Sequence, residues 1–75
     1  MSYESLESNF NTDGLLKFRL YSLDYIIRKN VNGVEIYALL YPKDKKVFTS
    51  FTDLMMNYTI YNISLNNYVN KITVI

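Results

Sequence analysis

The feature that most constrains the fold of this chain is the dipeptide Asn32-Gly33, which joins two apolar-rich runs within residues 25–41. Both central residues of a type I′ turn need positive φ angles, and Asn and Gly tolerate these angles best. An Asn-Gly pair between two strand-like runs therefore predicts a β-hairpin. We expect the two runs to pair as antiparallel strands around this turn.

The turn also determines which side chains share a face of the predicted hairpin. One face is mostly apolar, and we expect it to be buried. It comprises Tyr25, Ile27 and Val31 on the first strand and Val34, Ile36, Ala38 and Leu40 on the second. The opposite face is mixed in polarity. There the same register pairs Asn30 with Glu35, Arg28 with Tyr37 and Ile26 with Leu39.

The residues before the hairpin predict a short helix and a further strand. Residues 2–10 place Tyr3, Leu6 and Phe10 at helical spacing. The breaker cluster at residues 11–14 would end this helix, and the alternative is a disordered N-terminal arm.

Residues 15–21 alternate between apolar and polar side chains, which is typical of a half-buried strand. The apolar phase then changes across residues 22–24, which indicates either a tight turn or a bulge. We favour the turn, because a third strand gives a marginal two-stranded hairpin a wider face to bury.

The residues after the hairpin predict a turn and then two helices. The sheet either ends before the turn at residues 42–46 or gains a short strand at 46–49. Ser50 is suited to cap the first helix. The apolar stripe of that helix comprises Phe51, Leu54, Met55, Tyr58 and Tyr61. We expect a second helix from Ser64 to about residue 70, followed by a strand or an extended tail at 71–75.

Together these elements predict an α+β fold, with residues 1–75 forming one small domain. Its centre would be a three-stranded antiparallel β-meander packed against a C-terminal helix. A short N-terminal helix and a second short C-terminal helix or strand complete the expected fold. The helix at residues 51–61 would lie across the apolar face of the hairpin.

Composition argues against most enzyme classes and against a bound cofactor. The chain has no Cys and no His, so disulfides, the usual zinc ligands and the commonest catalytic bases are missing. It has only two Gly residues, too few for a phosphate-binding loop, and its acidic residues show no metal-binding spacing. We therefore expect no catalytic residues, no metal and no cofactor.

The charge and hydropathy of the chain favour neither a nucleic acid nor a membrane as its partner. The formal net charge is +1, which provides no global field toward nucleic acid. No apolar run approaches the ~20 residues needed to span a bilayer, and the first residues are acidic, unlike a secretory signal. A cytoplasmic location is the expectation.

The mixed face of the hairpin is the candidate partner-binding surface. It carries Ile26, Tyr37 and Leu39, with Tyr21 and Tyr41 nearby. Either another segment of the chain covers this face and completes the core, or the face binds a protein partner. A second copy of the chain is the commonest such partner. The expected function is that of a protein-binding module, a homodimer that could regulate or inhibit a larger protein.

The alternative function is binding of single-stranded nucleic acid by a basic loop. Its residues would be Lys43, Lys45 and Lys46, with Arg28 on a neighbouring strand. Such a loop beside tyrosines could bind phosphates and stack bases. Asp44 interrupts the run, however, and the near-zero net charge favours an ordinary solvated turn.

Overall fold

A computed structural model of the chain describes residues 2–75 and shows the α+β class that the sequence predicts. One layer is a five-stranded antiparallel sheet with the strand order β4-β3-β2-β1-β7. Its strands are β1 (Leu15–Leu20), β2 (Leu23–Asn30), β3 (Gly33–Ala38), β4 (Lys46–Phe48) and β7 (Thr73–Val74). The sheet therefore extends the predicted three-stranded meander by one short strand at each edge, where a strand was in both places one of the alternatives.

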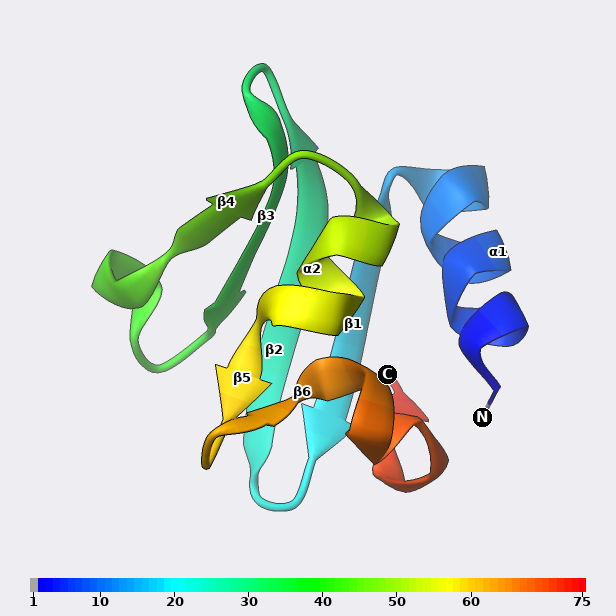
Figure 1. Ribbon diagram of the computed structural model, residues 1–75, viewed down its shortest axis with the longest axis vertical. Coiled ribbons are helices and arrows are strands. Elements are labelled where there is room, and N and C mark those ends of the chain that lie inside the picture. Colours follow the sequence, from blue (N-terminus) through cyan, green and yellow to red (C-terminus); the bar gives the residue numbers. More distant parts are fainter. Residues whose placement is uncertain (1) are drawn as a thin grey trace.

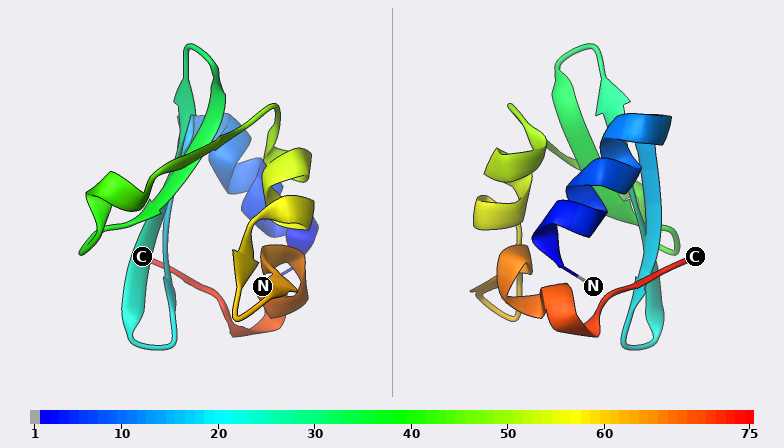
Figure 2. Two further views of the ribbon diagram at one scale, coloured as in Figure 1. Left: turned by 60° about the vertical axis from the view of Figure 1, so that its left-hand side comes forward. Right: turned by 90° about the vertical axis from the view of Figure 1, so that its right-hand side faces the viewer.

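The second layer consists of helices and a small hairpin, all on one side of the sheet (Figure 1 and Figure 2). The helices are α1 (Tyr3–Asp13), α2 (Phe51–Asn57) and the 3-10 helix η2 (Leu65–Lys71), and the hairpin is β5 (Thr59–Ile60) with β6 (Ile63–Ser64). A 3-10 turn, η1 (Pro42–Asp44), connects β3 to β4. No helix among residues 2–75 is both long enough and apolar enough to cross a membrane.

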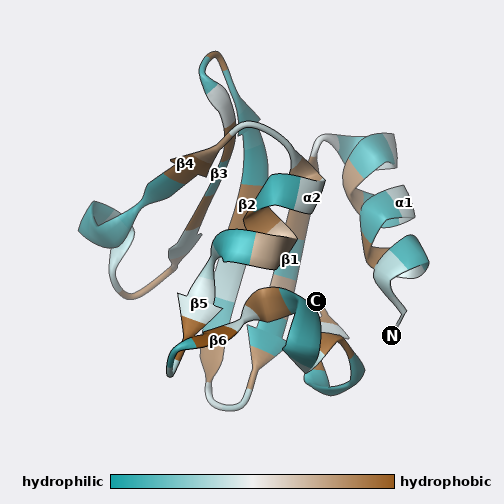
Figure 3. Ribbon diagram, viewed as in Figure 1, coloured by the Kyte–Doolittle hydropathy of each residue, from teal (hydrophilic) through white to brown (hydrophobic). Residues whose placement is uncertain are grey.

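The N-terminal helix is ordered, with a cap at each end. The Ser2 hydroxyl accepts a hydrogen bond from the Ser5 N–H at the start of α1. Gly14 ends the helix in a left-handed conformation with φ 67°, and its N–H bonds the Phe10 carbonyl. In Figure 3 the ribbon of α1 alternates between hydrophilic and hydrophobic colour. Its apolar side, with Leu6 and Phe10, is buried in the core.

The predicted register of the central hairpin is wrong by two residues. Gly33 pairs with Asn30, so Val31 and Asn32 form the turn. Neither turn residue has a positive φ, so the turn is not type I′. The Asn30 side-chain oxygen accepts a hydrogen bond from the Asn32 N–H at 2.8 Å. This bond stabilises a turn that lies one residue earlier in the chain than the predicted Asn32-Gly33 turn. Because a two-residue change in pairing keeps each strand's parity, the faces are nevertheless those expected.

Gly33 is required for a reason other than the one predicted. It begins β3 with φ 140°, and a Cβ atom built there would clash with the backbone carbonyl of Phe48 on β4.

Two residues that the sequence assigned to the buried face of the hairpin are exposed instead. Val31 lies in the turn, and Leu40 lies beyond the end of β3 with 72% of its surface exposed.

The core lies between the inner face of the sheet and the second layer. Phe18, Ile27 and Ile36 from the sheet pack in one cluster with Leu54 of α2 and Leu65 of η2. The helix α2 and the central hairpin thus contribute to the same core. The helix ends at Asn57 rather than Tyr61, because Tyr58 is already extended and the β-branched residues after it form β5.

The C-terminal elements differ in type from those expected. Residues 65–71 form a 3-10 helix, and Thr73–Val74 then pair with β1. The strand alternative for the last residues is therefore correct. The small hairpin before them turns at Tyr61 and Asn62, both of which have positive φ.

Candidate functional site

The sheet has an outer face, which we define as the face turned away from α1, α2 and η2 (Figure 2). Ile26 identifies this face, because its neighbours Tyr25 and Ile27 belong to the core cluster and Ile26 does not. The register then assigns the remaining outer-face positions. They are Leu15, Lys17, Arg19, Asp24, Arg28, Asn30, Glu35, Tyr37, Leu39, Val47, Thr73 and Ile75.

Ile26 lies at the centre of the outer face. It sits on the middle strand, opposite Tyr37 on β3 and Lys17 on β1. Only 9% of its surface is exposed, although no helix of residues 2–75 lies over it. Neighbouring side chains on the sheet therefore supply its cover. Around it, four apolar side chains are exposed, namely Leu15, Leu39, Val47 and Ile75.

The structure brings three of the five predicted partner-binding residues onto one surface. Ile26 and Tyr37 are direct cross-strand neighbours, and the Leu39 N–H continues the ladder by bonding the Asp24 carbonyl at 2.9 Å. Tyr21 lies elsewhere, in the β1–β2 turn, with its ring edge-on to Tyr68 of η2.

The fifth residue, Tyr41, is exposed and lies outside the sheet. It lies three residues after the end of β3 and immediately before η1. The outer face thus carries fewer aromatic residues than the sequence indicated, and more aliphatic ones.

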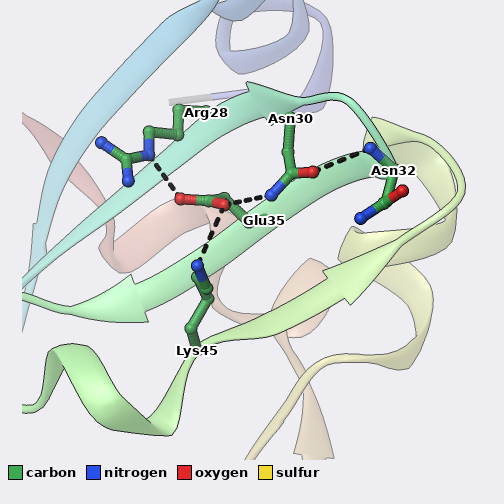
Figure 4. A network of polar contacts seen from close by, with 5 residues as sticks. All are labelled: Arg28, Asn30, Asn32, Glu35 and Lys45. Carbon is green, nitrogen blue, oxygen red and sulfur yellow. Dashed lines mark hydrogen bonds and ion pairs between the residues drawn. The ribbon is translucent and has the colours of Figure 1, made fainter.

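A buried carboxylate occupies the outer face beside the hairpin turn (Figure 4). Glu35 is only 2% exposed and accepts hydrogen bonds from Arg28 at Oε2 and from Asn30 at Oε1. The Lys45 Nζ lies 3.6 Å from the same Oε1 atom. The hydrogen bond from Asn30, followed by that from Arg28, lowers the pKa of Glu35. Because Asn30 also binds the Asn32 backbone, this network joins the turn to both strands of the hairpin.

Two further contacts order the cations of the outer face. The Arg28 guanidinium lies 5.5 Å from the centre of the Tyr37 ring, a cation–π distance. Arg19 binds Asp24 through two hydrogen bonds, of 2.6 and 3.1 Å. These bonds from Arg19 lower the pKa of the Asp24 carboxyl. The acids of this face therefore already have cationic partners within the chain.

The residues of the predicted nucleic-acid loop do not form one patch. Lys45 and Arg28 both lie against Glu35, on the outer face. Lys46 is paired with Ile36, a core residue, and so faces the other side of the sheet. Lys43 lies in η1. The adjacent residues Lys45 and Lys46 thus lie on opposite faces of the sheet.

The Glu35 network could not be recognised from the sequence as such. A single carboxylate on an alternating strand is usually solvated, so the sequence gives no indication that Glu35 is buried. The predicted hairpin places Asn30, Glu35 and Arg28 on one face, and this shared face is the only signal of the network in the sequence. The contribution of Lys45 depends on β4 pairing with β3, and no local pattern reveals that.

Comparisons with protein-family models, with curated proteins and with solved structures gave no match. Within residues 2–75, no three acidic side chains cluster as a metal site would require.

Proposed function

We propose that this chain is a non-enzymatic protein-binding module that self-associates through the outer face of its sheet. The observation that carries the proposal is a sheet layered by helices on one face only, with exposed apolar side chains on the other. An apolar surface of this kind in a small protein is typical of an interface. Homodimers are the commonest way in which such a surface is buried.

The geometry of the face is compatible with packing of sheet on sheet. Two sheets pack about 10 Å apart, with the side chains of their facing surfaces interleaved. In each copy, side chains of suitable size flank Ile26 on both sides. They are Tyr37 and Leu39 on one side and Leu15 on the other. A two-fold arrangement would form four layers, with the helices outermost and the two sheets at the centre.

The charged groups of the face are compatible with partial burial. A buried carboxylate is costly unless it is paired and hydrogen-bonded. Glu35 and Asp24 already have such partners within the chain, and no buried side-chain nitrogen or oxygen of the described residues lacks one. Association would therefore not separate either acid from its cation.

Addition of a strand at a sheet edge has less support than face packing. The two edge strands are β4, with three residues, and β7, with two. Edges this short offer few free backbone groups to a partner. The outer face offers a larger and more apolar contact.

The proposal is tested by sedimentation velocity on two adjacent substitutions. Leu39→Glu places a charge on the outer face, whereas Leu40→Glu places the same charge one residue later, at a position that is more exposed. We expect the unmodified chain and Leu40→Glu to sediment as dimers and Leu39→Glu as a monomer. A monomeric unmodified chain, or equal dimerisation of both variants, would refute self-association through this face.

A further inference from the structure

A second candidate surface is a pocket of about 370 Å³ at the end of the molecule where two turns meet. One turn joins β1 to β2 and the other joins β5 to β6, and both lie at the same end in Figure 1. Six of the lining residues are aromatic or aliphatic, namely Leu20, Tyr21, Leu23, Tyr25, Ile60 and Tyr61. No lining side chain is charged. The volume is within the range of ligand pockets.

Backbone strain occurs at both turns that border the pocket. Tyr21 and Tyr61 each have φ 55°, in the left-handed region. A bulky residue is rare there, because its Cβ crowds the backbone. Such strain clusters at sites of function. The only other non-glycine residue of the described chain with positive φ is Asn62, which tolerates it.

Both strained tyrosines present their rings to solvent. Tyr61 is 84% exposed, and Tyr21 is exposed as well. A side-chain hydrogen bond from η2 stabilises the turn that contains Tyr61, because the Tyr68 hydroxyl donates to the Ile60 carbonyl at 2.7 Å. Tyr68 also contacts the Tyr21 ring edge-on. One buried tyrosine thus links the two turns and holds their exposed rings at the rim.

Tyr25 lines this pocket and carries a hydroxyl that makes no hydrogen bond to the described residues. The residue is 94% buried, since 6% of its surface is exposed. Within residues 2–75 the tyrosine hydroxyls with hydrogen-bond partners are those of Tyr3 and Tyr68. No fully buried side-chain oxygen of the described residues lacks a partner, so the Tyr25 oxygen, which has none, is not fully buried. A tyrosine hydroxyl is protonated at neutral pH, and burial raises the pKa of Tyr25 further, so the group can donate a hydrogen bond.

We propose that this pocket, bordered by Tyr21, Tyr25 and Tyr61, binds an extended proline-rich peptide segment. A polyproline II helix has no internal hydrogen bonds, so its carbonyls are free to accept one from a tyrosine hydroxyl. Proline rings lack charge and N–H donors, which suits an uncharged aromatic lining. Aromatic grooves bind such segments because the ligand is already ordered before it binds.

The pocket lies on the inner side of the sheet, so this proposal does not depend on the outer face. A test uses a capped peptide of about ten prolines, which is long enough to form a polyproline II helix. Amide signals of the labelled protein are followed by NMR during titration, and the peptide adds none of its own. We expect saturable shifts at residues 20–25 and 60–62. The same result is expected in Leu39→Glu, whatever its oligomeric state.

Three variants assign the binding to the pocket. Tyr61→Asn keeps a turn that tolerates positive φ but removes the ring, and we expect roughly tenfold weaker binding. Tyr25→Phe removes one hydroxyl, and we expect about fivefold weaker binding. Tyr41→Asn removes an exposed tyrosine outside the pocket and should bind as the unmodified chain does.

Several outcomes would overturn the assignment of this ligand. They are no saturable shift, shifts confined to the outer face, and unchanged binding by Tyr61→Asn with its fold intact. Titration with a neutral linear oligosaccharide provides the comparison, since sugars also stack on tyrosines. Saturation by the oligosaccharide at residues 20–25 and 60–62, without saturation by the peptide, would assign the pocket to carbohydrate.

Discussion

Ile26 and Tyr37 face each other across β2 and β3, on the side of the sheet that no helix of residues 2–75 covers. Ile26 is nevertheless nearly buried, because side chains on the neighbouring strands surround it. Tyr37 in turn lies under the Arg28 guanidinium, which also binds Glu35. The apolar centre of this face and its ionic network are therefore one connected structure, and the proposed interface includes both.

The outer face carries an excess of positive charge, which gives the proposed dimer a characteristic response to salt. Its cations are Lys17, Arg19, Arg28 and Lys45, and its acids are Asp24 and Glu35. Face-to-face packing brings two such surfaces together, so added salt should screen their repulsion. We expect the dimer to tighten by a few-fold when ionic strength rises from about 0.05 to 0.5 M. Concentration-dependent sedimentation at both ionic strengths measures this change.

The same measurement distinguishes other partners from self-association. Binding of an acidic protein or of single-stranded nucleic acid through these cations would weaken as salt rises. A dimer that dissociates on addition of salt would contradict packing of like-charged outer faces.

Glu35→Gln should destabilise the fold at neutral pH by about 1–3 kcal/mol, because it removes the charge that Arg28 and Lys45 contact. The folded-state pKa of Glu35 is lower than its usual value, mainly through Asn30. A lowered folded-state pKa stabilises the protein above the unfolded-state pKa of about 4.3, and the effect is lost as pH falls through the folded-state pKa. The difference between the two proteins should therefore shrink on acidification.

Urea unfolding at pH 7 and near pH 3 tests this expectation. Glu4→Gln, in the exposed first turn of α1, is the matched control and should change stability by less than about 0.5 kcal/mol. A constant difference between Glu35→Gln and the unmodified chain across this pH range would exclude the ionised carboxylate as its cause.

Gly33→Ala should be strongly destabilising, by at least about 2 kcal/mol. Its φ of 140° disfavours any side chain, and a Cβ would meet the Phe48 carbonyl of β4. Gly14→Ala is the comparison, because Gly14 also has a positive φ but its nearest contact is the flexible Lys29 side chain at 3.8 Å. Thermal unfolding of both variants should show the greater loss for Gly33→Ala, and the reverse order would contradict the close approach of β4.

Tyr61→Asn should leave the fold as stable or raise its stability by about 0.5–1 kcal/mol, because Asn tolerates the left-handed conformation better than Tyr. Tyr61→Ala keeps the unfavourable φ and removes the ring, so it serves as the control. Denaturant unfolding of the two variants should place Tyr61→Asn above Tyr61→Ala. A marked loss of stability in Tyr61→Asn would show that the ring supports the fold rather than a ligand.

Local patterns predicted the elements that depend on near neighbours. The apolar spacing of residues 2–10 predicted α1, which continues three residues past the predicted end, to Asp13. The strand β1 alternates as its sequence does. The faces of the hairpin were predicted correctly although its register was not, because the error in pairing was two residues.

Elements that depend on distant partners could not be predicted in this way. The hairpin turn is shifted by the Asn30 side chain and by the approach of Phe48 to Gly33, a contact between different strands. The two-residue strand β7 exists only because β1 offers it a free edge. The pocket beside Tyr61 likewise forms where two turns, far apart in sequence, meet.

The most direct test of the proposed dimer interface is an isotope-filtered NOE experiment on an equal mixture of labelled and unlabelled chains. Only contacts between two copies give signals in this experiment. We expect NOEs from the Leu39 and Ile26 methyl groups of one copy to the Tyr37 ring of the other. Absence of intermolecular NOEs, or their restriction to residues outside the outer face, would contradict the proposed interface.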